Sequence, residues 1–308
     1  MIAGPTASGK TLAGLDLARI LKEEKGARPA EIVNADAIQV YGDIPILSSQ
    51  PTDEERDSIP HHLFGYLSGA TRCSAGGWYK DAATVLKDIA FRRSTAIVVG
   101  GTGLYFRALL GQLSDIPDIP SEIAAEARSH LEDVGLPQFR QNLLTVDPEM
   151  ARLDPNDRQR HLRAWSVYKA TGRPLSSFQT ASAGSAQEVD AKVVIEPDRE
   201  ELYRRCDDRF DKMLALGAID EAKRLIREGY ARDMPVMKAV GVAELVSYLD
   251  GDISLDDAIT LAKRNTRRLA KRQLTWFRNQ TADWPRAASS RAATEVLRQA
   301  LRDQSNSV

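Results

Sequence analysis

An eight-residue stretch near the amino end has the residue types and spacing of a phosphate-binding loop. Gly4 and Gly9 stand on either side of four residues and are followed by Lys10 and Thr11, where a helical pattern begins. In such a loop, backbone N–H groups and the helix amino end surround a phosphate, the lysine adds charge, and the threonine hydroxyl can hold Mg²⁺. A plain glycine-rich turn before a helix is the alternative, and the spacing favours the phosphate-binding loop.

Asp36 and Thr102 are two further residues that could take part in chemistry at that loop. Asp36 ends a short apolar strand pattern over residues 31–36, and Thr102 follows the apolar run 95–99 and two glycines. At the carboxyl edge of a parallel sheet, a carboxylate faces the same crevice as the loop, so Asp36 could be a general base. A helix N-cap or turn role is the structural alternative for Asp36, and a helix cap is the simpler interpretation of Thr102.

Two segments of the chain are basic and contain no acidic residue. The segment 263–278 has five basic side chains at spacings that predict one helical face: Arg264, Arg267, Arg268, Lys271 and Arg272. The segment 158–173 is basic as well and carries interleaved aromatic residues. One such run is usually a solvated helix face. Two of them beside a phosphate-binding loop favour a polyanion larger than a nucleotide as the partner.

The composition is that of an ordinary globular protein. The 308 residues are 43% hydrophobic and 28% charged, and 42 basic side chains almost balance 43 acidic ones. A net charge of -1 gives no overall attraction to nucleic acid, so any such affinity must be local. Cys73 and Cys206 belong to no metal-ligand spacing, which favours a reducing cytoplasm. No apolar stretch is long enough to span a bilayer, and the amino end lacks a signal-peptide pattern.

The elements that must position these residues alternate along the chain. Apolar runs at 31–36, 62–67 and 95–99 predict strands, and patterns of 3.6-residue period at 11–21 and 75–91 predict helices. Strands that alternate with helices form a parallel sheet with helices on both faces. Residues 122–170 are almost entirely helical in pattern, and 193–197 predicts a strand that returns to the sheet. We therefore predict an α/β fold with a core of residues 1–112 and 190–308 and a helical insertion over 113–189.

Six motifs occur together and in order: Gly4-Pro5-Thr6-Ala7-Ser8-Gly9-Lys10-Thr11, Asn34-Ala35-Asp36-Ala37-Ile38-Gln39-Val40-Tyr41, Pro60-His61-His62-Leu63, Gly100-Gly101-Thr102-Gly103-Leu104-Tyr105, Asn156-Asp157-Arg158-Gln159-Arg160 and Arg268-Leu269-Ala270-Lys271-Arg272-Gln273-Leu274-Thr275-Trp276. Together they resemble the tRNA dimethylallyltransferase family, whose bacterial members isopentenylate an adenosine beside the anticodon. The resemblance runs over most of the chain.

The resemblance implies a P-loop kinase-like parallel sheet that takes dimethylallyl diphosphate in place of ATP, with Mg²⁺ as the cofactor. It implies transfer of the dimethylallyl group to the exocyclic N6 of the adenosine just 3′ of the anticodon, with release of diphosphate. The partners would be dimethylallyl diphosphate and the anticodon stem-loop of tRNA. We expect a monomer that contacts tRNA through the helical insertion and has no membrane association.

The resemblance also implies a role for each matching residue. Asp36 would be the base on the N6 amine, and Thr102 the hydroxyl beside the reacting groups. The diphosphate would be bound by Gly4, Thr6, Ala7, Ser8, Gly9, Lys10, Thr11 and Lys238, with Mg²⁺ at Thr11. The tRNA would contact three groups of residues, namely Asp36, Ala37, Ile38 and Gln39 with Thr102, then Gln159, Arg160, His161, Leu162 and Arg163, and finally Arg268, Leu269, Ala270, Lys271, Arg272 and Gln273.

Two positions depart from the family's pattern. Lys238 stands where some relatives carry an arginine near the diphosphate, and a lysine keeps the charge but loses the bidentate fork. Ala124 stands where an arginine that contacts tRNA is expected, and the nearest basic residue is Arg128. The sequence leaves open whether the missing basic residue at Ala124 weakens the tRNA contact.

Two other functions fit parts of the pattern. A small-molecule or nucleotide kinase would use the same loop with Asp36 as base, but it needs no channel for RNA. The two basic segments therefore favour tRNA prenyl transfer over a kinase. A non-catalytic RNA-binding protein with a vestigial loop would not need Lys10, Thr11, Asp36 and Thr102 together.

Overall fold

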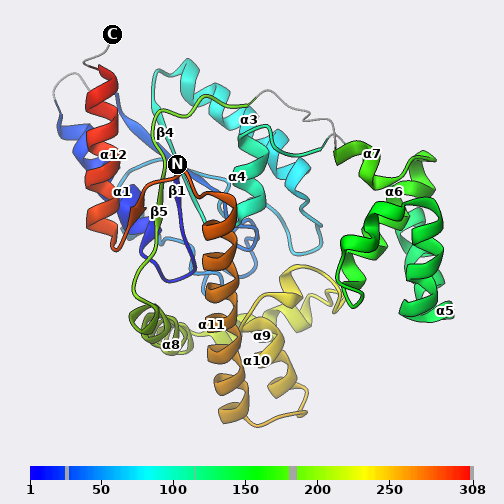
Figure 1. The fold of residues 1–308 in the computed structure, drawn as a ribbon. Helices are drawn as coiled ribbons and strands as arrows, with labels where there is room; N and C mark the ends of the chain where they lie inside the picture. The colour runs from blue at the N-terminus through cyan, green and yellow to red at the C-terminus, as the bar shows by residue number, and fades with distance from the viewer. Residues whose placement is uncertain (25–27, 115, 180–185, 306–308) are drawn as a thin grey trace. The chain divides into compact units, whose positions relative to one another are not determined.

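The computed structural model describes residues 1–24, 28–114, 116–179 and 186–305 (Figure 1). The chain divides into two compact units, one made of residues 1–106 and 188–308 and the other of residues 107–187. Residues 115 and 180–185 of the predicted insertion lie outside the described part.

The first unit contains one parallel sheet of six strands. These are β1 (Ile2–Ala3), β2 (Ala30–Asn34), β3 (His61–His62), β4 (Thr95–Gly100), β5 (Val193–Ile195) and β6 (Arg286–Ala287). Their order is β3-β2-β4-β1-β5-β6, and every pairing is parallel. The predicted α/β fold with a parallel sheet is confirmed.

Some helices of this unit pack on the sheet and others pack on one another. They are α1 (Lys10–Glu23), α2 (Asp53–Arg56), α3 (Ala75–Phe91), α8 (Arg199–Ala215), α9 (Ala218–Arg227), the 3-10 turn η2 (Val236–Lys238), α10 (Val242–Leu249), α11 (Leu255–Gln280) and α12 (Ser290–Ser305). The helix α4 (Gly103–Leu109) begins in the first unit and ends in the second. Figure 1 shows α1 and α12 on one face of the sheet and α3 on the other.

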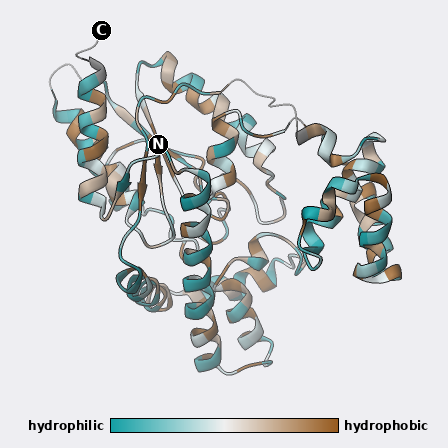
Figure 2. Ribbon diagram, in the orientation of Figure 1, coloured by the Kyte–Doolittle hydropathy of each residue, from teal (hydrophilic) through white to brown (hydrophobic). Residues whose placement is uncertain are grey.

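The core follows from the alternation of side chains along the strands. Ile32 and Ile97 are partners in adjacent strands, and both point into an apolar cluster that includes Leu17 of α1 and Leu297 of α12. The central strands are accordingly the most apolar elements, whereas much of α8 is hydrophilic (Figure 2). Burying these aliphatic side chains holds α1 and α12 against one face of the sheet.

Strand bounds differ from the prediction in several places, among them β5, which is predicted over 193–197 and ends at Ile195. The pattern at 62–67 predicts a six-residue strand, but β3 has two residues and Leu67 makes only an isolated bridge to Tyr41. The strand predicted over 31–36 ends at Asn34, so Asp36 lies in the turn that follows it. The edge strand β6 was not predicted, because its two residues carry no period-two pattern.

The second unit is helical. It contains α5 (Ser121–Val146), the 3-10 turn η1 (Pro148–Arg152), α6 (Arg158–Thr171) and α7 (Leu175–Gln179). Gly135, two residues before Pro137, interrupts α5 with a φ of 73°. Leu143, Met150 and Val167 form its apolar core with Phe178. Among the described residues, no helix of either unit is long and apolar enough to cross a membrane.

An ion-pair cluster around the buried Glu31 joins β2, β3 and the end of α3. The carboxylate of Glu31 accepts hydrogen bonds from Arg92 at 3.1 and 2.8 Å and lies 2.7 Å from Nε2 of His62. Glu31 is only 5% exposed. The bonds from Arg92 lower the pKa of Glu31 from 4.5 to about 2, against the opposing effect of burial.

We expect Glu31→Gln to destabilise the protein by about 2 to 3 kcal/mol at pH 7. Because the folded-state pKa is depressed, this stabilisation is present above the unfolded value of 4.5 and is lost as pH falls toward 2. The difference in urea-unfolding free energy between wild type and variant should therefore shrink at pH 3. Glu23→Gln removes the same charge from an exposed position and is the control; equal behaviour of both variants would contradict the cluster's role.

Candidate functional site

Residues 4–9 connect β1 to α1 in a tight turn. Ala7 and Gly9 have positive φ angles of 62° and 90°, and Gly9 is the N-cap of α1. A Cβ atom on Gly4 would lie 2.8 Å from the carbonyl oxygen of Ile195, so this position requires glycine. The Ser8 hydroxyl is buried and has no hydrogen-bond partner among the described residues. The turn is therefore a polar hollow at a helix amino end, the geometry that binds a phosphate group.

Two cations flank this hollow. Lys10 Nζ donates to the carbonyl oxygen of Pro5 at 2.7 Å, and burial lowers the pKa of Lys10 to about 8, with the Asp36 carboxylate acting in the opposite direction. Arg209 of α8 donates to Oγ1 of Thr6, and burial lowers its pKa as well. In the described part of the chain, neither cation forms an ion pair with a carboxylate. Both charges are therefore available to an anionic ligand.

Asp36 lies just beyond the end of β2. The amide of Asn34 binds the backbone of Asp36 at both N and O, and Asp36 Oδ1 accepts from Ile38 N at 3.0 Å. The predicted turn role of Asp36 is therefore real, but it uses only one carboxylate oxygen. No group in the described ranges donates a hydrogen bond to Oδ2, and a Cβ atom on Gly101 would lie 3.4 Å from it. This second oxygen is free to accept a proton.

Thr102 holds the segment that carries Asp36. Its hydroxyl accepts from Ala37 N at 2.9 Å, and its own N–H donates to Ala35 O at 3.2 Å. The hydroxyl thus binds the strand-end segment. Thr102 also directly precedes α4, and its carbonyl oxygen accepts from Tyr105 N at 2.9 Å, so the residue stands at the start of that helix as well. A Cβ atom on Gly100 would lie 2.0 Å from Ala35 O, so glycine is what allows the two strand ends to come this close.

Two predicted tRNA contacts have side chains bound within the protein. Gln273 of α11 accepts from Thr6 N at 2.8 Å and donates to Gly101 O at 2.9 Å. Gln39 donates to the carbonyl oxygens of Ser48 and Ser49. These amides fix the phosphate-binding loop and the 44–51 loop, a role that motif spacing did not indicate.

Two cavities meet at Asp36. The larger, of about 420 Å³, is lined by residues 6–12 of the phosphate-binding loop, by Gln39 and by Phe64. The smaller, of about 250 Å³, has an apolar wall that includes Leu47, Phe210 and Leu269 and also contains Thr102 and Gln273. Four residues line both cavities: Thr6, Asp36, Ser48 and Arg209. A carboxylate and a guanidinium therefore stand between a polar and a partly apolar compartment.

Lys238 ends η2, is exposed and lines neither cavity. Its role in binding the diphosphate therefore stays a prediction. Arg209, which was not predicted, supplies the second cation. It shares its side of α8 with the buried Leu202, Cys206 and Met213. A charged residue in an apolar stripe was the signal that could have identified it.

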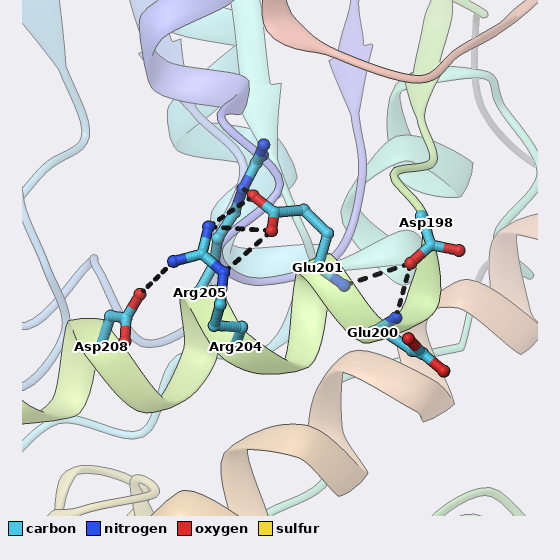
Figure 3. Close-up of polar contacts among 6 residues, drawn as sticks. All are labelled: Asp198, Glu200, Glu201, Arg204, Arg205 and Asp208. Atoms are coloured by element: carbon cyan, nitrogen blue, oxygen red, sulfur yellow. Dashed lines mark hydrogen bonds and ion pairs between the residues drawn. The ribbon is translucent and has the colours of Figure 1, made fainter.

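Two other arginines of α8 form ion pairs with acidic residues of the same helix (Figure 3). Arg204 and Arg205 both bind Glu201, at 2.8 and 2.6 Å, and Arg204 also reaches Asp208 at 2.8 Å. Asp198 caps this helix by accepting from two backbone N–H groups. The contrast indicates that Arg209 alone of these three arginines is directed at the cavities.

The basic face of α11 is narrower than predicted. Lys263 pairs with Asp211, Arg267 with Asp207 and Arg278 with Glu196, each at 2.6 Å. The five cations predicted to share a helical face all lie on α11, but Arg267 is bound to Asp207 of α8. Four exposed cations have no ion pair among the described residues: Arg264, Arg268, Lys271 and Arg272. Ala270 is fully buried against α8, so the predicted tRNA contact by its side chain is wrong, and Leu269 lines the smaller cavity.

The segment 159–163 of α6, which is predicted to contact tRNA, also contains both exposed and buried residues. Gln159, Arg160 and Arg163 are exposed, although Arg160 lies 3.3 Å from Asp157. Leu162 is half-buried, and His161 has no exposed surface, so a side-chain contact of His161 with tRNA is wrong in this structure. A helix that packs on one side buries residues that recur every three or four positions and leaves the others exposed. Ala124 is half-buried on α5 of the same unit.

The chain matches a known protein family. A family model described as IPP transferase matches residues 39–280. The chain is 46% identical over 287 residues to a tRNA dimethylallyltransferase of Phenylobacterium zucineum, covering 93% of this chain and 91% of that protein. It is 48% identical over 289 residues to one from a Caulobacter species, with the same coverage of both chains.

Solved structures resemble the fold over its whole length. The tRNA isopentenylpyrophosphate transferase of Bacillus halodurans superposes with a TM-score of 0.68 at 32% identity, covering 99% of this chain and 97% of that one. A eukaryotic dimethylallyltransferase acting on tRNA gives a TM-score of 0.78 at 27% identity, over 94% of this chain and 73% of that one.

Proposed function

The chain belongs to the IPP transferase family of tRNA dimethylallyltransferases, and from its site we propose that it transfers a dimethylallyl group from dimethylallyl diphosphate to tRNA. The acceptor is N6 of the adenosine just 3′ of the anticodon. The observation that carries this proposal is the position of Asp36, whose carboxylate lines both the phosphate-loop cavity and the partly apolar one.

Stabilising the leaving diphosphate supplies much of the catalysis. An adenine amine is a poor nucleophile because its lone pair is delocalised into the ring, so the allylic C–O bond must break readily. Its cleavage builds negative charge on the departing diphosphate, at the loop N–H groups, Lys10 and Arg209. Preorganised donors of this kind are worth about 3 to 4 kcal/mol each when one is removed.

Asp36 handles the proton. As the N6–carbon bond forms and the carbon–oxygen bond breaks, the free Oδ2 accepts the amine proton, and the diphosphate leaves with the electron pair of the broken bond. Thr102 keeps the segment in place through Ala37 N. Because a base stacked in the anticodon loop is out of reach, the adenosine must be extruded, and the smaller cavity is its place in the reaction.

A magnesium ion fits the larger cavity at Thr11. The Thr11 hydroxyl lines this cavity at the start of α1, beside Lys10 and the unpartnered Ser8 hydroxyl. A hydroxyl with phosphate oxygens and waters is a usual ligand set for Mg²⁺ at such a loop. When bound, the ion would neutralise part of the diphosphate charge.

The four exposed cations of α11 that form no ion pair among the described residues bind the tRNA backbone. If each pairs with a phosphate, the logarithm of affinity should fall with the logarithm of salt concentration at a slope near -3. Arg268→Gln should reduce that slope by about 0.7 to 0.9, in a filter-binding titration. Arg278→Gln is the matched control on the same helix, because its guanidinium is bound to Glu196. Equal slopes for both variants would place the tRNA elsewhere.

One incubation tests the proposed reaction. Unmodified tRNA, Mg²⁺ and radiolabelled dimethylallyl diphosphate are combined with the protein, and ATP labelled in its γ-phosphate is offered in a parallel sample. Label in the RNA without ATP supports prenyl transfer. Transfer of phosphate from ATP, with no prenyl label in RNA, would favour a kinase and overturn the proposal.

A further inference from the structure

Glu221 is a buried carboxylate that takes no part in the chemistry described above. It lies in the first turn of α9 and is 0% exposed, yet it lines neither cavity. A charged group is costly to bury unless its oxygens are hydrogen-bonded. Its partners therefore show what the burial achieves.

The carboxylate binds the backbone of a distant loop. Oε1 accepts from Ile46 N at 3.0 Å, and Oε2 accepts from Leu47 N at 2.7 Å. The side chain of Arg224 lies 3.6 Å from Oε1 on the other side. Burial raises the pKa of Glu221, while the two N–H groups and Arg224 act in the opposite direction. Neither N–H group has a backbone acceptor among the described residues. The carboxylate of Glu221 is therefore the hydrogen-bond acceptor for both.

The loop 44–51 forms part of the wall of both cavities. Leu47 belongs to the apolar wall of the smaller one, Ser49 and Pro51 to the larger one, and Ser48 lines both. A Cβ atom on Gly241 would lie 3.0 Å from Leu47 and 3.1 Å from Phe210, so Leu47 is packed closely beside the pocket. The far side of the loop is held by Gln39, which donates to Ser48 and Ser49. Among the described residues, only Glu221 accepts hydrogen bonds from the N–H groups of Ile46 and Leu47.

We propose that Glu221 is a positioning residue for the transfer reaction: its buried carboxylate pins the 44–51 loop and so fixes Leu47 and Ser48 at the junction where donor and acceptor meet. This inference rests on the proposed function, because it assigns the two cavities to the diphosphate donor and the extruded base. Small displacements of groups that position a substrate are known to reduce rates by up to about 100-fold.

Two substitutions separate the effect of the hydrogen bonds from that of packing. Glu221→Gln keeps the side-chain volume but has only one oxygen to accept the two N–H groups, and its amide nitrogen is a donor. Glu221→Ala removes both acceptors. Asp220→Asn removes the same charge from the preceding residue, whose carboxyl is 72% exposed, and is the matched control.

Amide hydrogen exchange of the peptide covering residues 44–50 gives a readout that does not depend on activity. We expect faster exchange in Glu221→Ala, intermediate exchange in Glu221→Gln and wild-type exchange in Asp220→Asn. The KM for dimethylallyl diphosphate should rise at least about 10-fold in Glu221→Ala, more than kcat falls, with the KM for tRNA within about 2-fold of wild type.

Unchanged exchange in both Glu221 variants would overturn the pinning. Faster exchange with an unchanged KM and kcat would mean that Glu221 is structural only, and would overturn its role in the reaction. If Glu221→Ala does not fold, the Glu221→Gln variant decides both points. Should the wild-type protein transfer no prenyl group, the proposed function fails, while the exchange measurement still decides whether Glu221 pins the loop.

Discussion

Replacing Asp36 by alanine is expected to slow the prenyl-transfer step at least about 100-fold while leaving tRNA affinity almost unchanged. The structure sharpens this expectation, because the two carboxylate oxygens do different work. Oδ1 closes a turn by accepting from Ile38 N, and Oδ2 faces the cavities without a donor in the described part of the chain. Single-turnover transfer and filter binding measure the two quantities separately.

Asp36→Asn is the sharper variant. Asparagine can keep the bond to Ile38 N through its side-chain oxygen, but it cannot accept a proton at neutral pH. A loss of rate in Asp36→Asn as large as in Asp36→Ala therefore assigns the effect to proton transfer. If Asp36→Asn is nearly as fast as wild type while Asp36→Ala is slow, then the residue only shapes the turn and the general-base role is wrong.

Removing the guanidinium of Arg209 is expected to lower kcat/KM for dimethylallyl diphosphate by about 10²- to 10³-fold. Arg209 is desolvated between the two cavities, where its charge acts at short range on the departing diphosphate. The variant is Arg209→Gln, and Arg204→Gln on the same helix is its control, since Arg204 is exposed and bound to Glu201 and Asp208 (Figure 3). Steady-state kinetics with saturating tRNA measure the difference, and equal effects of both substitutions would contradict it.

Arg209→Gln should also change how kcat/KM for dimethylallyl diphosphate depends on pH in the alkaline range. The pKa of Lys10 is lowered to about 8, so the free enzyme loses the Lys10 charge, and with it donor affinity, as pH rises through 8. The positive charge of Arg209 contributes to that lowering. Removing it raises the pKa of Lys10, so the decline of kcat/KM should begin at higher pH in Arg209→Gln than in wild type. If kcat/KM declines at the same pH in wild type and Arg209→Gln, then the protonation of Lys10 does not control the decline.

Local spacing was enough to locate the loop from Gly4 to Thr11 and the strand-end positions of Asp36 and Thr102. Such motifs depend on residues that are neighbours in the chain, and the parallel sheet brings all strand carboxyl ends to one edge. The α/β fold could be predicted for the same reason, because apolar runs and a 3.6-residue period depend only on near neighbours.

The identity of the remaining site residues was decided by tertiary structure. Arg209 reaches Thr6 across 203 residues of sequence, Gln273 across 267, and Glu221 reaches Ile46 across 175. Of the adjacent Arg267 and Arg268, one pairs with Asp207 and the other is exposed without an ion pair in the described ranges. From the sequence alone, the two residues look equivalent, because both belong to a segment of α11 that is basic throughout. Only the packing of α8 against α11 determines which cations are neutralised, because ion pairs form between side chains that folding, and not the order of residues, brings within reach.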